Sequence, residues 1–196
     1  GHFDVVNRLL QDERVNPSWV VAPACQSGNL NLVNRLLEDK RVNPSDNDNE
    51  AIRYASNCGC LDVVNRLLED KRVNPSDFDN YAIITASRSG YLDVVNRLLE
   101  DDRVNPSGNH NHAIRKASKR GRLDVVNRLL EDDRVNPGDN DNDAIIKASK
   151  NGHLDVVNRL LEDKRVDPSD GHNKAIRLAT KNGHLRVVKR LLEEVK

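Results

Sequence analysis

The sequence predicts an all-α solenoid of stacked helix–turn–helix pairs joined by abbreviated loops. The first observation is a 31-residue step between glycines, which recur at Gly28, Gly59, Gly90, Gly121, Gly152 and Gly183. The second is that each unit holds two short runs of apolar residues at helical spacing, separated by that glycine. The third is composition: only 3% of the residues are aromatic, so a thin core repeated along a stack is expected.

The first helix of each unit is expected to begin at an asparagine, a residue favoured at helix N-caps because its side chain accepts a backbone N–H bond. In one unit this residue is Asn49, and Ala51 and Ile52 follow on the predicted core face. Gly59 then ends the helix, since glycine readily adopts the left-handed conformation needed there. The first unit is shorter and has Pro23 in this segment, so its first helix is expected to be short.

The second helix of each unit is predicted from an amphipathic stripe. In the same unit, Leu61, Val64, Leu67 and Leu68 lie on one face, and the Asn-Pro dipeptide at 74–75 ends the segment. One such helix pair has too little apolar surface to fold alone, so neighbouring pairs must share a continuous core.

The segment from Gly152 to Glu162, Gly-His-Leu-Asp-Val-Val-Asn-Arg-Leu-Leu-Glu, resembles the second helix and exit loop of an ankyrin repeat. The resemblance covers essentially the whole chain. It implies one array over residues 1–196, with a leading outer helix at 1–15 and then about six repeats, the first of them shortened. Because the chain begins in the middle of a unit, we expect it to be a fragment of a longer array.

The units depart from the ankyrin pattern in the same way each time. The family's Thr-Pro-Leu-His opening is replaced by Glu50-Ala51-Ile52-Arg53 and its equivalents, and the unit has 31 residues instead of the usual 33. Asp48 and its equivalents stand where the loop tip usually has glycine. We therefore expect shortened loops whose turns depend on Asn and Asp side chains. Tetratricopeptide repeats, the alternative helical array, have a different period and different aromatic positions.

Cysteine content and hydropathy set expectations for the compartment. Three cysteines, an odd number, favour a reducing, cytoplasmic setting over a disulfide scaffold. The sequence has no apolar run of about 18 residues and no visible signal peptide, so we expect no membrane association. We also expect the chain to be monomeric.

Residues with reactive side chains give no catalytic or metal-binding pattern. Cys58 and Cys60 form a close thiol pair, but two further ligands for a metal are not evident near them. His110 and His172 occupy the same position two repeats apart, at roughly 20 Å if stacked helices lie about 10 Å apart, too far to share an ion. We therefore expect no enzyme activity, no metal and no cofactor.

Variation between the copies is concentrated at the loop tip and along the first helix, whereas the second helix hardly changes. In an ankyrin-like solenoid these positions line the concave groove that the family uses to hold protein partners, so they are the candidate binding residues. One of these variable positions alternates between arginine and isoleucine from unit to unit. Duplication of a two-repeat unit would explain this alternation without any function. The candidate partner-binding residues are Tyr54, Tyr81, Ile84, Tyr91, Arg115, Lys116, Lys119, Arg120, Arg122, Lys147, Lys150, Lys174, Arg177 and Lys181.

Charge distinguishes the variable surface from the rest of the chain. The chain has 31 Lys and Arg against 31 Asp and Glu, so its formal net charge is zero. The variable windows, which start at Glu50, Tyr81, His112, Asp143 and Lys174 and run eleven residues each, carry 0, +1, +5, +1 and +3 with neutral histidine. Their total of +10 leaves −10 for the remainder. A basic stripe of this kind attracts anionic partners.

The pattern predicts a non-catalytic protein-interaction scaffold whose basic face binds an acidic segment of a partner protein. Arg115, Lys119, Arg120, Lys150 and Lys181 are expected to supply the charge. Tyr54, Tyr81 and Ile84 are expected to supply apolar anchoring in the N-terminal half. The alternative is a structural spacer within a larger protein, in which the variable positions have drifted. Nucleic-acid binding is disfavoured because the tyrosines lie on the less basic side.

Overall fold

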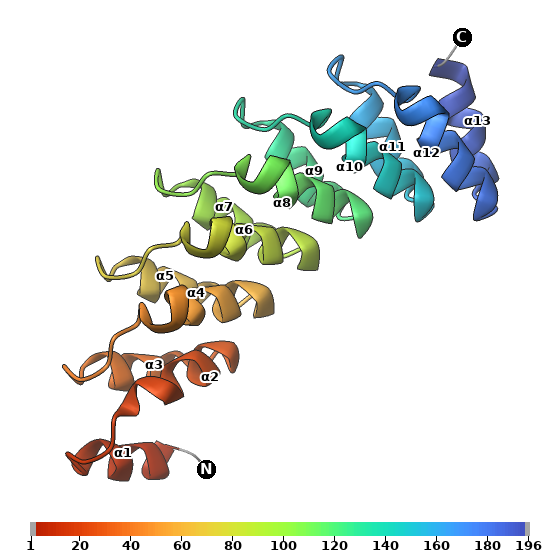
Figure 1. Ribbon diagram of the computed structural model, residues 1–196. Helices are drawn as coiled ribbons and strands as arrows, with labels where there is room; N and C mark the ends of the chain where they lie inside the picture. The colour runs from red at the N-terminus through yellow and green to blue at the C-terminus, as the bar shows by residue number, and fades with distance from the viewer. Residues whose placement is uncertain (1–2, 195–196) are drawn as a thin grey trace.

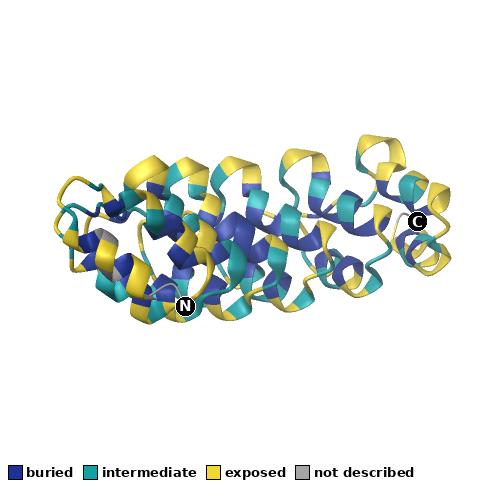
Figure 2. Cartoon of the chain, turned by 90° about the horizontal axis from the view of Figure 1, so that it is seen from below, coloured by how far each residue is buried: buried dark blue, intermediate teal, exposed yellow. Residues whose placement is uncertain are grey.

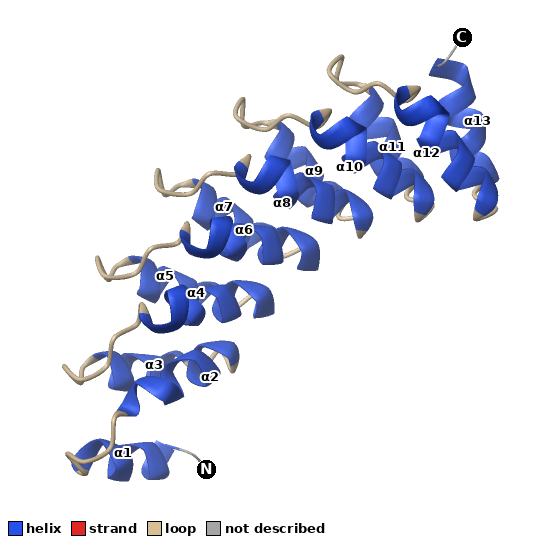
Figure 3. Cartoon of the chain, viewed as in Figure 1, coloured by secondary structure: helices blue, strands red, loops and turns tan. Residues whose placement is uncertain are grey.

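The chain forms a stack of helix pairs that follow one another in sequence order (Figure 1). A computed structural model describes residues 3–194, and every regular element within them is a helix, as Figure 3 shows. The prediction of an all-α helical solenoid is therefore confirmed. No helix within these residues has the length and hydropathy that a membrane-spanning segment needs.

The leading helix, α1 (Phe3–Gln11), is followed by pairs made of an inner and an outer helix. Consecutive inner helices pack against each other, and each outer helix packs on its own inner helix. The inner helices are α2 (Val21–Gln26), which follows the short 3-10 helix η1 (Pro17–Val20), α4 (Asp46–Cys58), α6 (Asp77–Ser89), α8 (Gly108–Lys119), α10 (Asp139–Lys150) and α12 (Asp170–Lys181). The outer helices are α3 (Leu30–Leu37), α5 (Leu61–Leu68), α7 (Leu92–Leu99), α9 (Leu123–Leu130), α11 (Leu154–Leu161) and α13 (Leu185–Glu194).

The two ends of an inner helix lie on opposite edges of the array. Figure 1 shows that the pairs fan out, with the long loops along the outer edge of the arc and the glycine turns along its inner edge. The expectation that the loop tips line a concave groove is therefore wrong for the loops. The variable side chains of the inner helices lie between these two edges.

The core is a repeated thin layer between inner and outer helices. In the four central units one leucine of the outer helix and one isoleucine of the inner helix are fully buried, as Leu67 and Ile52 illustrate. Figure 2 shows this buried strip running through the length of the array, with exposed residues above and below it. Each layer is closed only when the next pair stacks on it, which is the reason one pair could not fold alone.

The inner helices α4, α6, α8, α10 and α12 each begin with a short stretch of left-handed backbone. In α4 the residues Asn47, Asp48 and Asn49 have φ of 53°, 56° and 57°, and the right-handed helix follows. Side-chain-bearing residues rarely adopt this conformation, and Asn and Asp tolerate it better than most. The Asn- and Asp-rich loop tip of the sequence is therefore explained by this turn.

The side chain of Asn49, an asparagine that recurs at the same position of the other units, links neighbouring helix pairs. The expectation that Asn49 caps its own helix is wrong, because its Oδ1 accepts a hydrogen bond from the backbone N–H of Asn74, at 2.8 Å, in the next unit. Its Nδ2 donates to Asp77, also in the next unit. Backbone N–H groups are bound in the same way by Asn80, Asn111 and Asn142. We call these four side chains the asparagine bridges.

The loops after the outer helices are held by a second repeated device, an Asp-x-Arg clip. In the loop after α7, both Nε and Nη2 of Arg103 donate to the carboxylate of Asp101, at 2.8 and 2.6 Å. Nη1 of Arg103 donates to the carbonyl of Val73 in the preceding unit, at 2.8 Å. The arginine therefore joins two loops, and the bidentate contact lowers the pKa of Asp101. The repeat pattern of the sequence does not predict this clip.

Pro23 lies in the first turn of α2, which spans only six residues. Proline is tolerated there because the N–H groups of the first turn have no partner within the helix.

The asparagine bridges should be a large source of stability. Asn111 is 5% exposed, accepts from the N–H of Asn136 and donates to Asp139. We expect Asn111→Gly to lower the free energy of unfolding by about 1–3 kcal/mol, because glycine keeps the left-handed backbone but leaves these groups unpaired. Urea denaturation checks this. Asn158→Ala, at an exposed position of α11, is the control; equal stability of both variants would contradict the bridging role.

The clips predict a specific acid response. Hydrogen bonds from the guanidinium of Arg41, and a further one from its backbone N–H, lower the pKa of Asp39 from 3.8 to about 2. Since the folded pKa lies below the unfolded value, the clip stabilises fully above pH 4, and its contribution is lost as the pH falls toward 2. We expect Asp39→Asn to be less stable than the wild type at neutral pH and the difference to shrink across this window. Denaturation at several pH values checks it, and a difference that stays constant down to pH 2 would contradict the clip.

Candidate functional site

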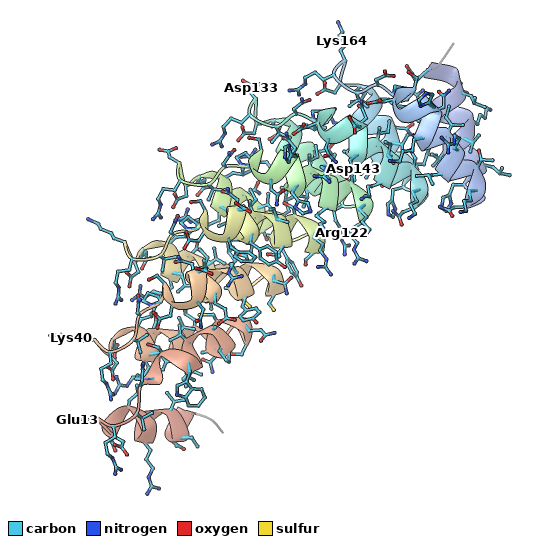
Figure 4. The ribbon with its side chains drawn as sticks, in the orientation of Figure 1. Glu13, Lys40, Arg122, Asp133, Asp143 and Lys164 are labelled. Carbon is cyan, nitrogen blue, oxygen red and sulfur yellow. The ribbon has the colours of Figure 1, made fainter. Side chains whose placement is uncertain are left out.

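The exposed sides of α4, α6, α8, α10 and α12 form one continuous surface, which we call the inner-helix face. The candidate residues are distributed along it, except for three discussed below. In Figure 4, Asp143 marks the middle of this face, while Lys40, Asp133 and Lys164 mark the loop edge and Arg122 the glycine-turn edge. The face therefore has a central strip and two borders.

Cations crowd around Lys116 on α8. Burial lowers the pKa of Lys116, and the nearby charges of Lys119, Arg88, Lys147 and Arg115 lower it further. The pKa of His112 is also lowered, first by burial and then by Lys116 and Arg115. Two groups on one helix thus favour their neutral forms, first because they are partly buried and then because neighbouring cations repel an added positive charge. This part of the face lacks enough negative charge to balance its cations. We call Arg88, Lys116, Lys119, Arg120 and Lys150 the basic cluster.

Arg115 is the exception among the α8 cations because it is already paired. Its Nε donates to Oδ2 of Asp143 on the next inner helix, at 2.7 Å, and both side chains are largely buried. Lys147 contacts the other oxygen of the same carboxylate, at 3.4 Å. Two of the predicted binding residues, Arg115 and Lys147, are therefore already paired with a carboxylate of the chain itself.

The predicted cations that remain form no ion pair among the residues the structure describes. Lys119, Arg120 and Lys150 lie exposed at the ends of α8 and α10. Lys174, Arg177 and Lys181 are exposed along α12. The structure thus brings together a basic strip that runs from α8 to the last pair.

Ile84 does not belong to this surface. It is only 4% exposed, because it packs in the core between neighbouring inner helices. The equivalent Ile146 is buried in the same way. The prediction that Ile84 anchors a partner is therefore wrong. At the alternating position the isoleucines are buried, whereas Arg53 and Arg115 are half-buried and Arg177 is exposed.

Tyr91 and Arg122 lie at the glycine-turn edge, where each covers the glycine of the preceding unit. A Cβ on Gly59 would lie 2.5 Å from the ring of Tyr91, and one on Gly90 would lie 2.7 Å from Cδ of Arg122. His153 and His184 cover the next two glycines and lie within hydrogen-bonding distance of carbonyl groups in the preceding unit. Tyr91 and Arg122 therefore act first as contacts between repeats.

The N-terminal half of the face holds an aromatic cluster that the sequence analysis only partly found. Tyr54 and Tyr81 were predicted, but Phe78 was not. The ring of Phe78 meets that of Tyr81 edge-on, at 5.6 Å between centroids, and the guanidinium of Arg53 lies 4.8 Å from the Phe78 centroid. The signal was in the sequence: the other units have asparagine or glycine where Phe78 stands.

Metal and cofactor sites find no support among the described residues. No group of three or more His, Cys, Asp or Glu side chains there could hold a metal ion. Cys25, Cys58 and Cys60 are free thiols. Burial raises the pKa of Cys25 to about 12, so this thiol is a poor nucleophile at neutral pH.

A stack of helix pairs with a common core and one variable face defines a helical repeat solenoid. The chain matches the family pattern described as ankyrin repeats (3 copies) over residues 23–111, 52–141 and 113–196. It belongs to the ankyrin repeat family. Domains of this family generally serve as protein–protein interaction modules and are typically non-catalytic.

Solved structures show the same fold. The human ASB11 ankyrin repeat domain superimposes with a TM-score of 0.74 at 20% sequence identity, covering 88% of this chain and 82% of that one. At this identity the similarity concerns the fold alone. No curated protein matches the chain in sequence.

The packing at the glycine turns is testable with a matched pair of variants. Gly121 and Gly183 both have positive φ, 66° and 76°, but a Cβ would lie 2.5 Å from His153 Nδ1 only at Gly121 and would meet nothing within 4 Å at Gly183. We expect Gly183→Ala to cost about 1–2 kcal/mol through backbone strain alone. Gly121→Ala should cost about 1–3 kcal/mol more, because the histidine must move. Urea denaturation measures both, and equal losses would show that the covering side chain contributes nothing.

Proposed function

We propose that this chain is a protein-interaction scaffold whose inner-helix face binds an acidic segment of a partner protein. The observation that supports it most strongly is the row of exposed cations, Lys119, Arg120 and Lys150, which form no ion pair among the described residues. Burial and then repulsion from neighbouring cations also lower the pKa of Lys116. A carboxylate placed near Lys116 would relieve that repulsion, and Asp143 on the next inner helix is already paired with Arg115 and Lys147.

The shape of the charged strip favours an extended segment. Exposed cations follow one another from Lys119 through Lys150 to Lys181, one inner helix after another. A chain of acidic residues laid across the inner helices would meet one cation per repeat. Such contacts speed association and set the register of the partner. The three free thiols support the further proposal that the protein works in a reducing compartment, such as the cytoplasm.

Charge reversal tests the proposal with a matched control. The test variant is Lys119→Glu, Arg120→Glu and Lys150→Glu together; all three side chains are exposed. The control is Lys40→Glu, Lys71→Glu and Lys164→Glu, which makes the same charge change at exposed positions of the loop edge. Peptides selected from a random library on the wild-type chain are the probes, with binding measured by fluorescence anisotropy.

The selected peptides should be rich in Asp and Glu, and their affinity should fall with added salt. Reversal in the basic cluster should weaken binding at least tenfold, about 1.4 kcal/mol, whereas the loop-edge control should stay within about twofold. A library that yields no binder would favour a structural spacer. Tight binding of labelled oligonucleotides, with none of acidic peptides, would favour a nucleic-acid role instead.

A further inference from the structure

Arg53 and Arg115 occupy the same position two repeats apart, on α4 and α8. Both guanidinium groups donate back to a carbonyl of their own left-handed turn: Arg53 to Asn47 at 2.8 Å, and Arg115 to His110 at 3.3 Å. The two arginines are therefore held in similar ways by their own units. What differs is the side chain that the next inner helix presents to them.

Asp143 is the residue that faces Arg115 from the next unit, at 2.7 Å. The equivalent residue next to Arg53 is Tyr81, whose ring centroid lies 5.8 Å from the guanidinium carbon. Arg53 forms no ion pair among the described residues, and its Nε is buried without a hydrogen-bond partner. Buried guanidinium N–H groups are usually bound, and one left without a partner is costly.

A cavity of about 320 Å³ opens beside Arg53. Its walls are formed by residues of α4 and α6: Glu50, Arg53, Tyr54, Asn57, Phe78, Tyr81 and Arg88. Glu50 is the one acid among them, and Asn47 donates a hydrogen bond to its carboxylate at 3.3 Å. Two arginines against one acid leave the cavity positive, and the rings give it apolar walls.

Phe78 is kept in this wall at a conformational cost. Its φ is 53°, in the left-handed region where a bulky side chain is an outlier, whereas the equivalent positions hold Asn47, Asn109, Asn140 and Gly171. The ring is nevertheless 57% exposed. An aromatic side chain that is strained, exposed and stacked on an unpaired arginine is typical of a binding surface rather than of a core.

We propose that the cavity receives a side-chain carboxylate of the bound partner, an Asp or Glu that pairs with Arg53 as Asp143 pairs with Arg115. The inference rests on the proposed function, since it adds one defined contact to the docking of an acidic segment. The methylene groups of the acidic residue lie against Phe78 and Tyr81, and Arg88 borders the same cavity. This contact fixes the register of the segment on the N-terminal half of the face.

A small probe tests this contact without any partner protein. The probe is N-acetyl-glutamate methylamide, titrated into the ¹⁵N-labelled chain while the Nε–H signal of Arg53, assigned with Arg53→Lys, is followed by NMR. We expect a saturable shift with a dissociation constant on the order of 1–10 mM, as a single ion pair on an apolar wall would give. The glutamine analogue should give no such shift. N-acetyl-glycine distinguishes a terminal carboxylate, which should bind more weakly because it lacks the methylene groups.

The controls are variants that exchange the residues facing the two arginines from the next inner helix. Tyr81→Asp should place a carboxylate of the chain itself beside Arg53, as Asp143 lies beside Arg115, and abolish the probe-induced shift at Arg53. Asp143→Tyr should free Arg115 and create a second saturable site there. Phe78→Asn should keep stability within about 1 kcal/mol, since relief of the backbone offsets the lost ring contacts, and should weaken the probe at least twofold.

Two results would overturn the inference: no saturable shift at Arg53, or an equal shift with the glutamine analogue. Reversal of Lys119, Arg120 and Lys150 should leave the shift unchanged. If acidic peptides bind the basic cluster but the probe causes no shift at Arg53, the proposed function is supported and the carboxylate contact with Arg53 is contradicted. If Arg53 binds the probe while acidic peptides fail to bind the chain, the proposed function fails and the site remains.

Discussion

The buried asparagine that joins each unit to the next is the interaction on which the rest of the structure depends. Asn49, Asn111 and Asn142 each fix the backbone of the following loop and bind an aspartate at the start of the following inner helix. To reach that position, each unit must begin its inner helix in left-handed backbone, which only a few residue types tolerate. The left-handed backbone therefore restricts the residue types found at the loop tip, whereas the exposed positions of the helix behind it vary more widely. The one link that differs is Asn80, which binds the N–H of Asn105 but faces Gly108 where the other units have aspartate.

The same constraint separates charge across the molecule. The aspartates of the asparagine bridges and the Asp-x-Arg clips have their carboxylates held in place by hydrogen bonds, as Asp77 and Asp101 illustrate. Cations accumulate on the inner-helix face, where Lys119, Arg120 and Lys150 have no such partners among the described residues. The net charge of zero thus combines +10 on the variable windows with −10 on the remainder of the chain. The near-identical units also provide a comparison within one molecule. Arg115 is paired with a carboxylate of the next inner helix, whereas Arg53, at the equivalent position, has no carboxylate partner among the described residues.

Periodicity was enough to predict the fold because a 31-residue step, a helix-ending glycine and an amphipathic stripe each require the same helix pair. Details that depend on contact between units were not predictable in this way. Asn49 looked like a helix cap because capping is its commonest use, and only the stacked neighbour shows that its side chain points across the repeat boundary. In the same way, only the stacked neighbour shows that Arg103 joins two loops.

The site was predicted in part for the same reason. Exposed cations such as Lys119 and Lys181 could be found from variation and charge alone. Burial of Ile84 and pairing of Arg115 could not, because both depend on what the next helix places opposite. Phe78 could have been found by asking which unit breaks the Asn/Gly rule at the left-handed turn, a question that requires the turn to be known.

A crystal structure of the chain with an acidic peptide selected from a random library would test the central claim most directly. The account predicts a peptide that crosses the inner helices α4 to α10, with carboxylates within about 3 Å of the cations on α8 and α10, the distance of a charge-assisted hydrogen bond. A peptide bound instead on the outer helices or along the loop edge would contradict it.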